Sequence, residues 1–271
     1  MHSIMLRLGW FSTGSGKGSL GLMNIIQECI ITGHLDAKIE FVFCNREFGE
    51  GIGSDEFLNQ VLDYDIPLVS LSSKKFRVEN GGGQFSKHRL AFDREVISLL
   101  EKYRPDICVM AGYMLIAGSE FNRHYRIINL HPSPIDGPTG TWQEVIWKLI
   151  ENQAVESGAY IHIVTDELDH GPVISYFSFP IVGQNFEPMW EMINRDTPKQ
   201  SENFQYDYSQ LFSLIREQGL IREKPLLLET IRALADGRIT ISDDNLVHSN
   251  GATGAVCMNE EIEKLMNTKD I

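Results

Sequence analysis

Features that mark several classes of protein are missing from this sequence. Its four cysteines, Cys29, Cys44, Cys108 and Cys257, lie far apart, and no two have the spacing of paired metal ligands. Isolated cysteines of this kind are typical of buried thiols in a reducing compartment. There is no run of about 18 apolar residues and no secretory signal at the N-terminus, so we expect a cytoplasmic chain without a transmembrane helix.

Positive charge is also scarce. The chain has 24 lysines and arginines against 37 aspartates and glutamates, which gives a net charge of -13. Nucleic acids are bound by clustered basic residues, so we expect no nucleic-acid partner. A small anionic ligand remains compatible with this charge, because a few local donors suffice for one phosphate.

Pairs of metal ligands are absent as well. The sequence has no His-x-x-x-His and no Cys-x-x-Cys pair, so we expect no metal centre. The alternative is that His162 and His170 bind a metal together with the neighbouring carboxylates.

Strand-like and helix-like segments alternate along the first part of the chain. We expect strands at residues 4–11, 39–44, 67–71, 107–111 and 127–131, and helices at residues 20–31, 54–63 and 87–103. The nearly continuous apolar strands predict an α/β fold with an open, doubly wound, mostly parallel sheet, of Rossmann type in its first half. Ligands of such sheets bind beyond the carboxyl ends of the strands.

The pattern changes after Pro138. We expect strands at residues 160–164, 173–179 and 238–242, helices at residues 141–150, 208–217 and 223–234, and an inserted loop at about residues 184–208 with a short helix near residues 189–193. Residues 243–271 read as a polar tail with a short helix at residues 259–266. This predicts one domain over residues 1–242 with an antiparallel C-terminal extension.

A loop rich in glycine and serine follows the first expected strand. It consists of Gly14, Ser15, Gly16, Lys17, Gly18 and Ser19. Backbone N–H groups at the start of the next helix could bind a phosphate there, with Lys17 adding charge. The loop lacks the Walker pattern, because Gly18 and not a hydroxyl residue follows Lys17. A plain strand-to-helix turn is an equally good interpretation.

Three polar residues form the most specific pattern. Asn129 and His131 alternate with apolar residues on one strand, so both side chains take the same face. Asp169 lies in a later loop, residues 166–172, whose acidic residues are Asp166, Glu167 and Asp169. An amide can stabilise an oxyanion, while an imidazole and a carboxylate can move protons, and this combination suits acyl transfer. The alternatives are a strand end with a surface histidine, and an ordinary acidic turn.

These motifs together resemble the folate-dependent formyltransferase family, and within it the branch that formylates glycinamide ribonucleotide in purine synthesis. The resemblance covers about residues 5–241 and is strongest at residues 91–95, 105–114, 127–133 and 161–174. It implies a formyltransferase-like catalytic domain at residues 1–242, with residues 243–271 as a tail.

The resemblance also implies roles for individual residues. Asn129, a protonated His131 and Asp169 would be catalytic, and 10-formyltetrahydrofolate would be the co-substrate. The acceptor would be a small primary amine, phosphorylated, with its phosphate against Gly14–Ser19 and its amine end near Glu223. The folate would bind at Arg89, Tyr113, Met114, Leu115, Ile116, Val164, Thr165, Asp166 and Glu167.

Several departures from the family pattern lie on the acceptor side. The glycine loop is longer and lacks the usual asparagine, the stretch at residues 134–140 differs, and the insertion at about residues 184–208 is extra. On the folate side, Leu115 replaces an arginine. The acceptor therefore stays open between glycinamide ribonucleotide and another amine such as an amino sugar nucleotide.

Other functions are compatible with the same motifs. Hydrolysis of the folate would put water in place of the amine, and a folate- or nucleotide-binding relative would lack catalysis. Transfer to methionyl-tRNA is disfavoured, because the chain is acidic. A homodimer is one possible oligomeric state.

Overall fold

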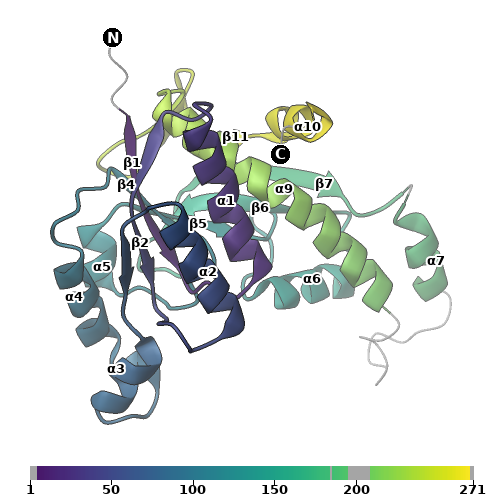
Figure 1. Cartoon of the computed structure of the whole chain (residues 1–271). Coiled ribbons are helices and arrows are strands. Elements are labelled where there is room, and N and C mark those ends of the chain that lie inside the picture. Colours follow the sequence, from purple (N-terminus) through teal and green to yellow (C-terminus); the bar gives the residue numbers. More distant parts are fainter. Residues whose placement is uncertain (1–4, 184, 195–207, 269–271) are drawn as a thin grey trace. The chain divides into compact units, whose positions relative to one another are not determined.

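The computed structural model describes residues 5–183, 185–194 and 208–268 (Figure 1). Its strands are β1 (Leu6–Ser12), β2 (Ala37–Cys44), β3 (Leu68–Ser70), β4 (Ile107–Met110), β5 (Ile127–His131), β6 (Glu156–Ile163), β7 (Val173–Pro180), β8 (Ile239–Ile241), β9 (Val247–Ser249), β10 (Ala252–Thr253) and β11 (Val256–Cys257). Its helices are α1 (Lys17–Ile31), α2 (Ile52–Asp63), α3 (Ser73–Glu79), the 3-10 turn η1 (Phe85–Lys87), α4 (Arg89–Leu99), α5 (Ser119–His124), α6 (Trp142–Glu151), α7 (Glu187–Asn194), α9 (Ser209–Ala235) and α10 (Asn259–Thr268).

The strands form two sheets. The large one has eight strands in the order β11-β7-β6-β5-β4-β1-β2-β3, and β10, β9 and β8 form a small antiparallel sheet. Neighbours β3, β2, β1, β4 and β5 run parallel, as do β7 and β11. Helices α1 and α2 lie on one side of β1, β2 and β4, and α4 and α5 lie on the other (Figure 1). The predicted doubly wound, mostly parallel α/β sheet with an antiparallel extension is confirmed.

The chain forms two compact units. The first comprises Met1–Asn129, His162–Pro172 and Thr230–Gly254, and the second comprises Leu130–Ile161, Val173–Glu229 and Ala255–Ile271. No helix in the described ranges is long and apolar enough to cross a membrane.

The core of the first unit is aromatic. Phe11 on β1 lies 5.6 Å from Phe41 and 5.3 Å from Phe121 between ring centroids, and all three are buried. Edge-to-face contacts of this kind add to the stabilisation from burial. This core supports β1, β2 and α5, so it holds the carboxyl ends of the strands where ligands are expected.

In the second unit an aromatic contact joins α6 to α9. Trp147 stacks on Phe212 at 4.4 Å between ring centroids. A capping box begins α6. The Thr141 side chain accepts a hydrogen bond from the Glu144 N–H, and the Glu144 side chain accepts one from the Thr141 N–H.

Helix α9 differs from the prediction. The pattern predicted two helices, at residues 208–217 and 223–234, whereas the structure has one helix of 27 residues with Pro225 inside it. The predicted break at residues 218–222 was wrong: α9 continues through it as regular helix, although residues 216–222 are only half-buried or exposed. In addition, Arg216 and Glu223 form an ion pair across the expected break, with Arg216 Nη1 2.5 Å from Glu223 Oε1.

The remaining differences concern short elements. The segment after Ser242 contains β9, β10 and β11 in addition to the expected final helix, which α10 confirms. Helices α3 and α5 are too short to give a periodic signal. The helix expected within the insertion corresponds to α7, while most of the insertion, residues 184 and 195–207, lies outside the described residues.

Candidate active site

Strand β5 carries two of the predicted catalytic residues. It begins with the buried Ile127 and Ile128, and it ends at His131, which is 4% exposed. Asn129 is half-buried and pairs in register with Met110 at the end of β4. Both polar residues therefore lie at the carboxyl end of a buried strand, where a parallel sheet places its ligands.

In the first unit, Asn129 and Asp169 meet at a third residue, His162. The Nε2 atom of His162 lies 3.3 Å from Nδ2 of Asn129 and 3.7 Å from Oδ1 of Asp169. His162 is 1% exposed, on β6. The sequence interpretation considered it only as a metal ligand. A lone histidine in an apolar strand is the signal that could have found it.

The hydrogen bonds of His162 indicate which ring nitrogen carries the proton when the ring is neutral. Its Nδ1 lies 3.1 Å from the carbonyl oxygen of Ile163, and a carbonyl only accepts, so Nδ1 carries the proton. In the neutral ring Nε2 is then an acceptor, and the amide N–H of Asn129 donates to it. This contact holds the amide in one orientation, with the nitrogen toward His162.

The loop that carries Asp169 is tightly built. Asp169 has a φ of 58°, in the left-handed region. A Cβ on Gly171 would lie 1.7 Å from the carbonyl oxygen of Ile163, so only glycine fits there. On the other side of the loop, Asn122 of α5 donates to the Thr165 carbonyl oxygen at 3.0 Å. These constraints hold the backbone of the loop that carries Asp169, whose side chain is 14% exposed.

His131 belongs to the second unit, where its neighbour is Tyr160. The two ring centroids are 5.2 Å apart with an interplanar angle of 45°. Beyond His131 the chain turns sharply: the Ser133 N–H donates to the His131 carbonyl oxygen, and Ser133 Oγ donates to the Pro138 carbonyl oxygen at 2.8 Å. The His131 side chain therefore contacts the Tyr160 ring, and the His131 backbone is part of a hydrogen-bonded turn.

The predicted folate segment, residues 113–116, alternates between core and surface. Tyr113 and Leu115 pack against the aromatic core, and burial raises the pKa of the Tyr113 hydroxyl. Met114 and Ile116 are 65% and 46% exposed. The N–H of Met114 donates to Thr13 Oγ1 at 2.9 Å, which anchors the segment to the end of β1. The exposed side chains are thus presented on a fixed backbone.

Behind this segment lie Arg89 and Asp93, both on α4. The Nε of Arg89 is buried and has no hydrogen-bond partner among the described residues. Asp93 accepts a hydrogen bond from the N–H of Gly118 at 2.8 Å at the start of α5. Burial raises the pKa of Asp93 to about 6, against the opposing effects of the Gly118 hydrogen bond and Arg89.

The later part of the predicted folate site belongs to the loop between β6 and β7. Val164 packs against the aromatic core, and its N–H donates to the Ile127 carbonyl oxygen. Asp166 accepts a weaker hydrogen bond from Asn122 at 3.3 Å, and the Glu167 N–H donates to Thr165 Oγ1. The loop is therefore tied to β5 and to α5.

The glycine loop leads directly into α1. Gly16 is the N-terminal cap and has no capping side chain, and the first turn contains Lys17 and no acidic residue. A Cβ on Gly112 would lie 2.1 Å from Ser19 Oγ, so the loop and the segment after β4 are in close contact. The start of α1 keeps the uncapped N–H groups and positive dipole end that favour an anion.

Glu223, in the second unit, is already paired. It is buried beside Arg216, and burial raises its pKa while Arg216 opposes the shift. The guanidinium of Arg216 also lies 4.5 Å from the centre of the Trp142 ring.

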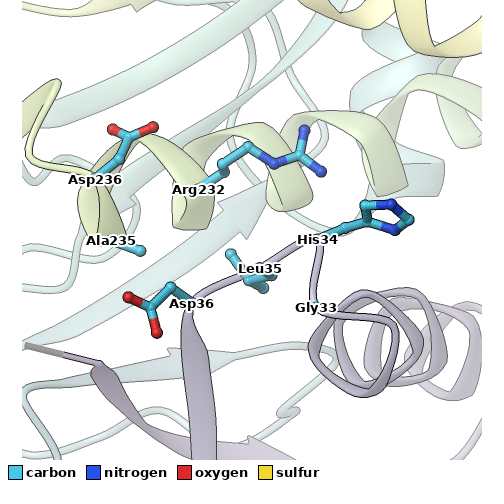
Figure 2. A pocket seen from close by; sticks show the side chains of 7 residues that line it. All are labelled: Gly33, His34, Leu35, Asp36, Arg232, Ala235 and Asp236. Atoms are coloured by element: carbon cyan, nitrogen blue, oxygen red, sulfur yellow. The ribbon is translucent and has the colours of Figure 1, made fainter. Parts of the chain in front are cut away.

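A separate pocket of about 320 Å³ lies in the first unit, ahead of β2 (Figure 2). It is lined by Gly33, His34, Leu35, Asp36, Arg232, Ala235 and Asp236. It precedes a strand, whereas the predicted site follows strands, so it contains none of the predicted residues. Within the described ranges, no three metal-ligating side chains form a group.

These observations describe an α/β protein in which the candidate catalytic residues Asn129 and His131 lie at the carboxyl end of the central strand β5. The family model for formyl transferase matches residues 13–191. The chain belongs to the formyl transferase family, as its motifs predicted, and it is an enzyme by that membership.

Relatives in sequence agree. Phosphoribosylglycinamide formyltransferase of Escherichia coli K12 is 40% identical over 175 residues, which cover 64% of this chain and 73% of the relative. The enzyme of the same name from Saccharomyces cerevisiae is 33% identical over 181 residues, covering 62% and 79%.

Solved structures share the fold. Phosphoribosylglycinamide formyltransferase from Coxiella burnetii has a TM-score of 0.62 at 24% identity, covering 94% of this chain and all 100% of that one. A formyltetrahydrofolate deformylase from Pseudomonas syringae has a TM-score of 0.63 at 20% identity, covering 91% and 66%. At these identities the comparison establishes the fold alone.

Proposed function

We propose that this enzyme transfers the formyl group of 10-formyltetrahydrofolate to the amine of glycinamide ribonucleotide, a step of purine synthesis. The proposal is carried by one observation: residues that match the family's catalytic motifs, Asn129 and Asp169, meet around a buried histidine at the ends of the central strands. The 40% identity to the Escherichia coli enzyme supports this acceptor.

The chemistry needs three roles. The amine attacks the formyl carbon, a C–N bond forms, and the carbonyl oxygen becomes an oxyanion. The amide N–H of Asn129 and a protonated His131 would donate to that oxyanion, and Asp169 would accept the proton that the amine loses. The bond to the folate nitrogen then breaks, and that nitrogen takes up a proton, so formylated amine and tetrahydrofolate leave.

The folate would bind along the segment after β4 and along the loop before Asp169. Met114 and Ile116 offer exposed apolar contacts on an anchored backbone, and Thr165, Asp166 and Glu167 offer polar ones. The buried Nε of Arg89, which has no hydrogen-bond partner within the described ranges, is suited to a carboxylate of the folate tail. The acceptor phosphate would bind at the start of α1, where Lys17 adds a positive charge.

One observation favours a second candidate acceptor. Glu223, which the resemblance places near the acceptor's amine end, is already bound to Arg216 at 2.5 Å. A carboxylate in such a pair is less available to an incoming amine. An amino sugar nucleotide, recognised without Glu223, is therefore the alternative.

An acceptor comparison tests the proposal. The purified chain is given 10-formyltetrahydrofolate with glycinamide ribonucleotide, with an amino sugar nucleotide, or with no amine, and release of tetrahydrofolate is followed. We expect release that depends on glycinamide ribonucleotide. Release with the sugar nucleotide alone would move the assignment to the second acceptor, and equal release without any amine would indicate hydrolysis.

A further inference from the structure

Tyr160 contacts the imidazole that the proposed mechanism uses as a cationic donor. Its ring centroid lies 5.2 Å from that of His131 at an angle of 45°, and the two residues are 6% and 4% exposed. Tyr160 and His162 lie two residues apart on β6. His162 contacts Asn129 and Tyr160 contacts His131, so β6 supplies a neighbour for each of these two polar residues of β5.

Burial alone disfavours the protonated form of His131 that the proposed mechanism requires. Removing an imidazolium from water disfavours its charged form and lowers its pKa. A cation within about 6 Å of an aromatic ring centroid is attracted to the ring's electron-rich face, and this attraction strengthens when the pair is desolvated. The contact with Tyr160 therefore offsets part of the effect of burial, and the ring also limits rotation of the imidazole.

We propose that Tyr160 is a positioning residue that holds the His131 imidazole in place and favours its protonated form. The proposal rests on the proposed function, because it matters for catalysis only if His131 donates to an oxyanion. It concerns the electrons of the ring, so the hydroxyl of Tyr160 is not required.

Other titratable groups also bear on this imidazole. In the proposed mechanism the Asp169 carboxylate accepts the proton that the attacking amine loses. On β6 the titratable neighbours are His162, which faces Asn129 and Asp169, and the exposed Glu156 at the start of the strand. The variants below leave these three residues unchanged, so differences in the pKa of His131 report the contact with Tyr160.

The direct test is an NMR titration of the His131 ring in protein with isotope-labelled histidine. Tyr160→Leu removes the ring, Tyr160→Phe keeps it, and Phe179→Leu removes a buried ring from β7 as a matched control. We expect Tyr160→Leu to lower the pKa of His131 by roughly 0.5 to 1 unit, while the other two leave it near the wild-type value. An unchanged pKa in Tyr160→Leu, or an equal fall in Tyr160→Phe, would overturn the proposal.

If Tyr160→Leu does not fold, the ring can be weakened without losing volume. Phenylalanine and increasingly fluorinated phenylalanines at position 160 keep the shape and withdraw electrons from the ring face. A stepwise fall in the pKa of His131 along this series supports the contact, and a constant pKa contradicts it.

Kinetics separate this inference from the proposed function. With the pKa of His131 lowered, the alkaline fall in kcat should begin at lower pH in Tyr160→Leu, while kcat near pH 5 stays within about threefold of wild type. The NMR titration needs no substrate. A wild-type enzyme that fails to transfer formyl groups would refute the function and leave the pKa result standing, whereas active variants with an unshifted pKa would refute only the role of Tyr160.

Discussion

The orientation of the Asn129 amide depends on a second side chain, that of His162. Its spacing from His131 was visible in the sequence, because alternation along a strand places both on one face. Its orientation was not visible, since it depends on His162, which arrives from β6. Contacts between residues distant in the chain leave no periodic signal, so the sequence could mark His162 as a lone histidine in an apolar strand but could not show that it contacts Asn129.

Removing the Asn129 amide should slow turnover strongly. Losing one oxyanion donor typically costs about 100- to 1000-fold in kcat, and we expect that range for Asn129→Ala in a steady-state assay of tetrahydrofolate release. Asn152→Ala, an exposed asparagine at the end of α6, is the matched control and should behave like wild type. Near-normal turnover of Asn129→Ala would remove this residue from the mechanism.

Replacing His162 should affect catalysis through Asn129. His162→Leu leaves the half-buried amide N–H of Asn129 without its acceptor, a loss of about 1 to 3 kcal/mol, so kcat should fall by roughly 5- to 160-fold. His162→Gln offers a carbonyl oxygen to the same N–H and should recover part of the rate. Equal rates in the two variants, with melting temperatures like wild type, would argue against the orienting role.

Among the helices and strands, the sequence predicted those that have a clear apolar periodicity. The central strands and α1, α2 and α4 could be predicted because each has its own apolar stripe. Short α5 could not, although it anchors the Asp169 loop through Asn122. The break expected at residues 218–222 is absent from α9, and periodicity could not reveal that Arg216 and Glu223 form an ion pair across those residues.

The burial of Asp93 on α4 should make stability depend on pH. The pKa of Asp93 is raised from 3.8 to about 6 in the folded chain, so its stabilising contribution is complete below about pH 4 and is lost as pH rises through 6. Relative to Asp93→Asn, wild type should lose on the order of 2 kcal/mol of unfolding free energy between pH 4 and pH 7. Urea unfolding of both proteins across this range measures the difference, and parallel pH profiles would contradict it.

The ion pair within α9 should be sensitive to loss of one partner. Arg216→Met leaves the Glu223 carboxylate buried and unpaired, which should destabilise the chain by roughly 3 kcal/mol. The loss should shrink at low pH, where Glu223 takes up a proton. The double variant Arg216→Met, Glu223→Met should recover much of the stability. Thermal unfolding of the three proteins tests this, and a stable single variant would show that the pair does not hold α9 together.

For the molecule as a whole, the fold class and the family were readable before the structure, whereas the sheet order was not. Parallel strands are joined by crossovers whose direction periodicity does not reveal, and β11 adds to β7 from a segment that looked like a polar tail. The same limit applies to the site. The glycine loop and Glu223 are visible in the sequence, but which amine they accept depends on pairings such as Arg216 with Glu223.

The most direct measurement follows the transferred carbon itself. 10-Formyltetrahydrofolate labelled with ¹³C in the formyl group is incubated with glycinamide ribonucleotide and the wild-type enzyme, and the products are identified by mass spectrometry. We predict one labelled formyl group on the amine of glycinamide ribonucleotide for each tetrahydrofolate released. Label recovered as free formate, or retained on the folate, would contradict formyl transfer to this acceptor.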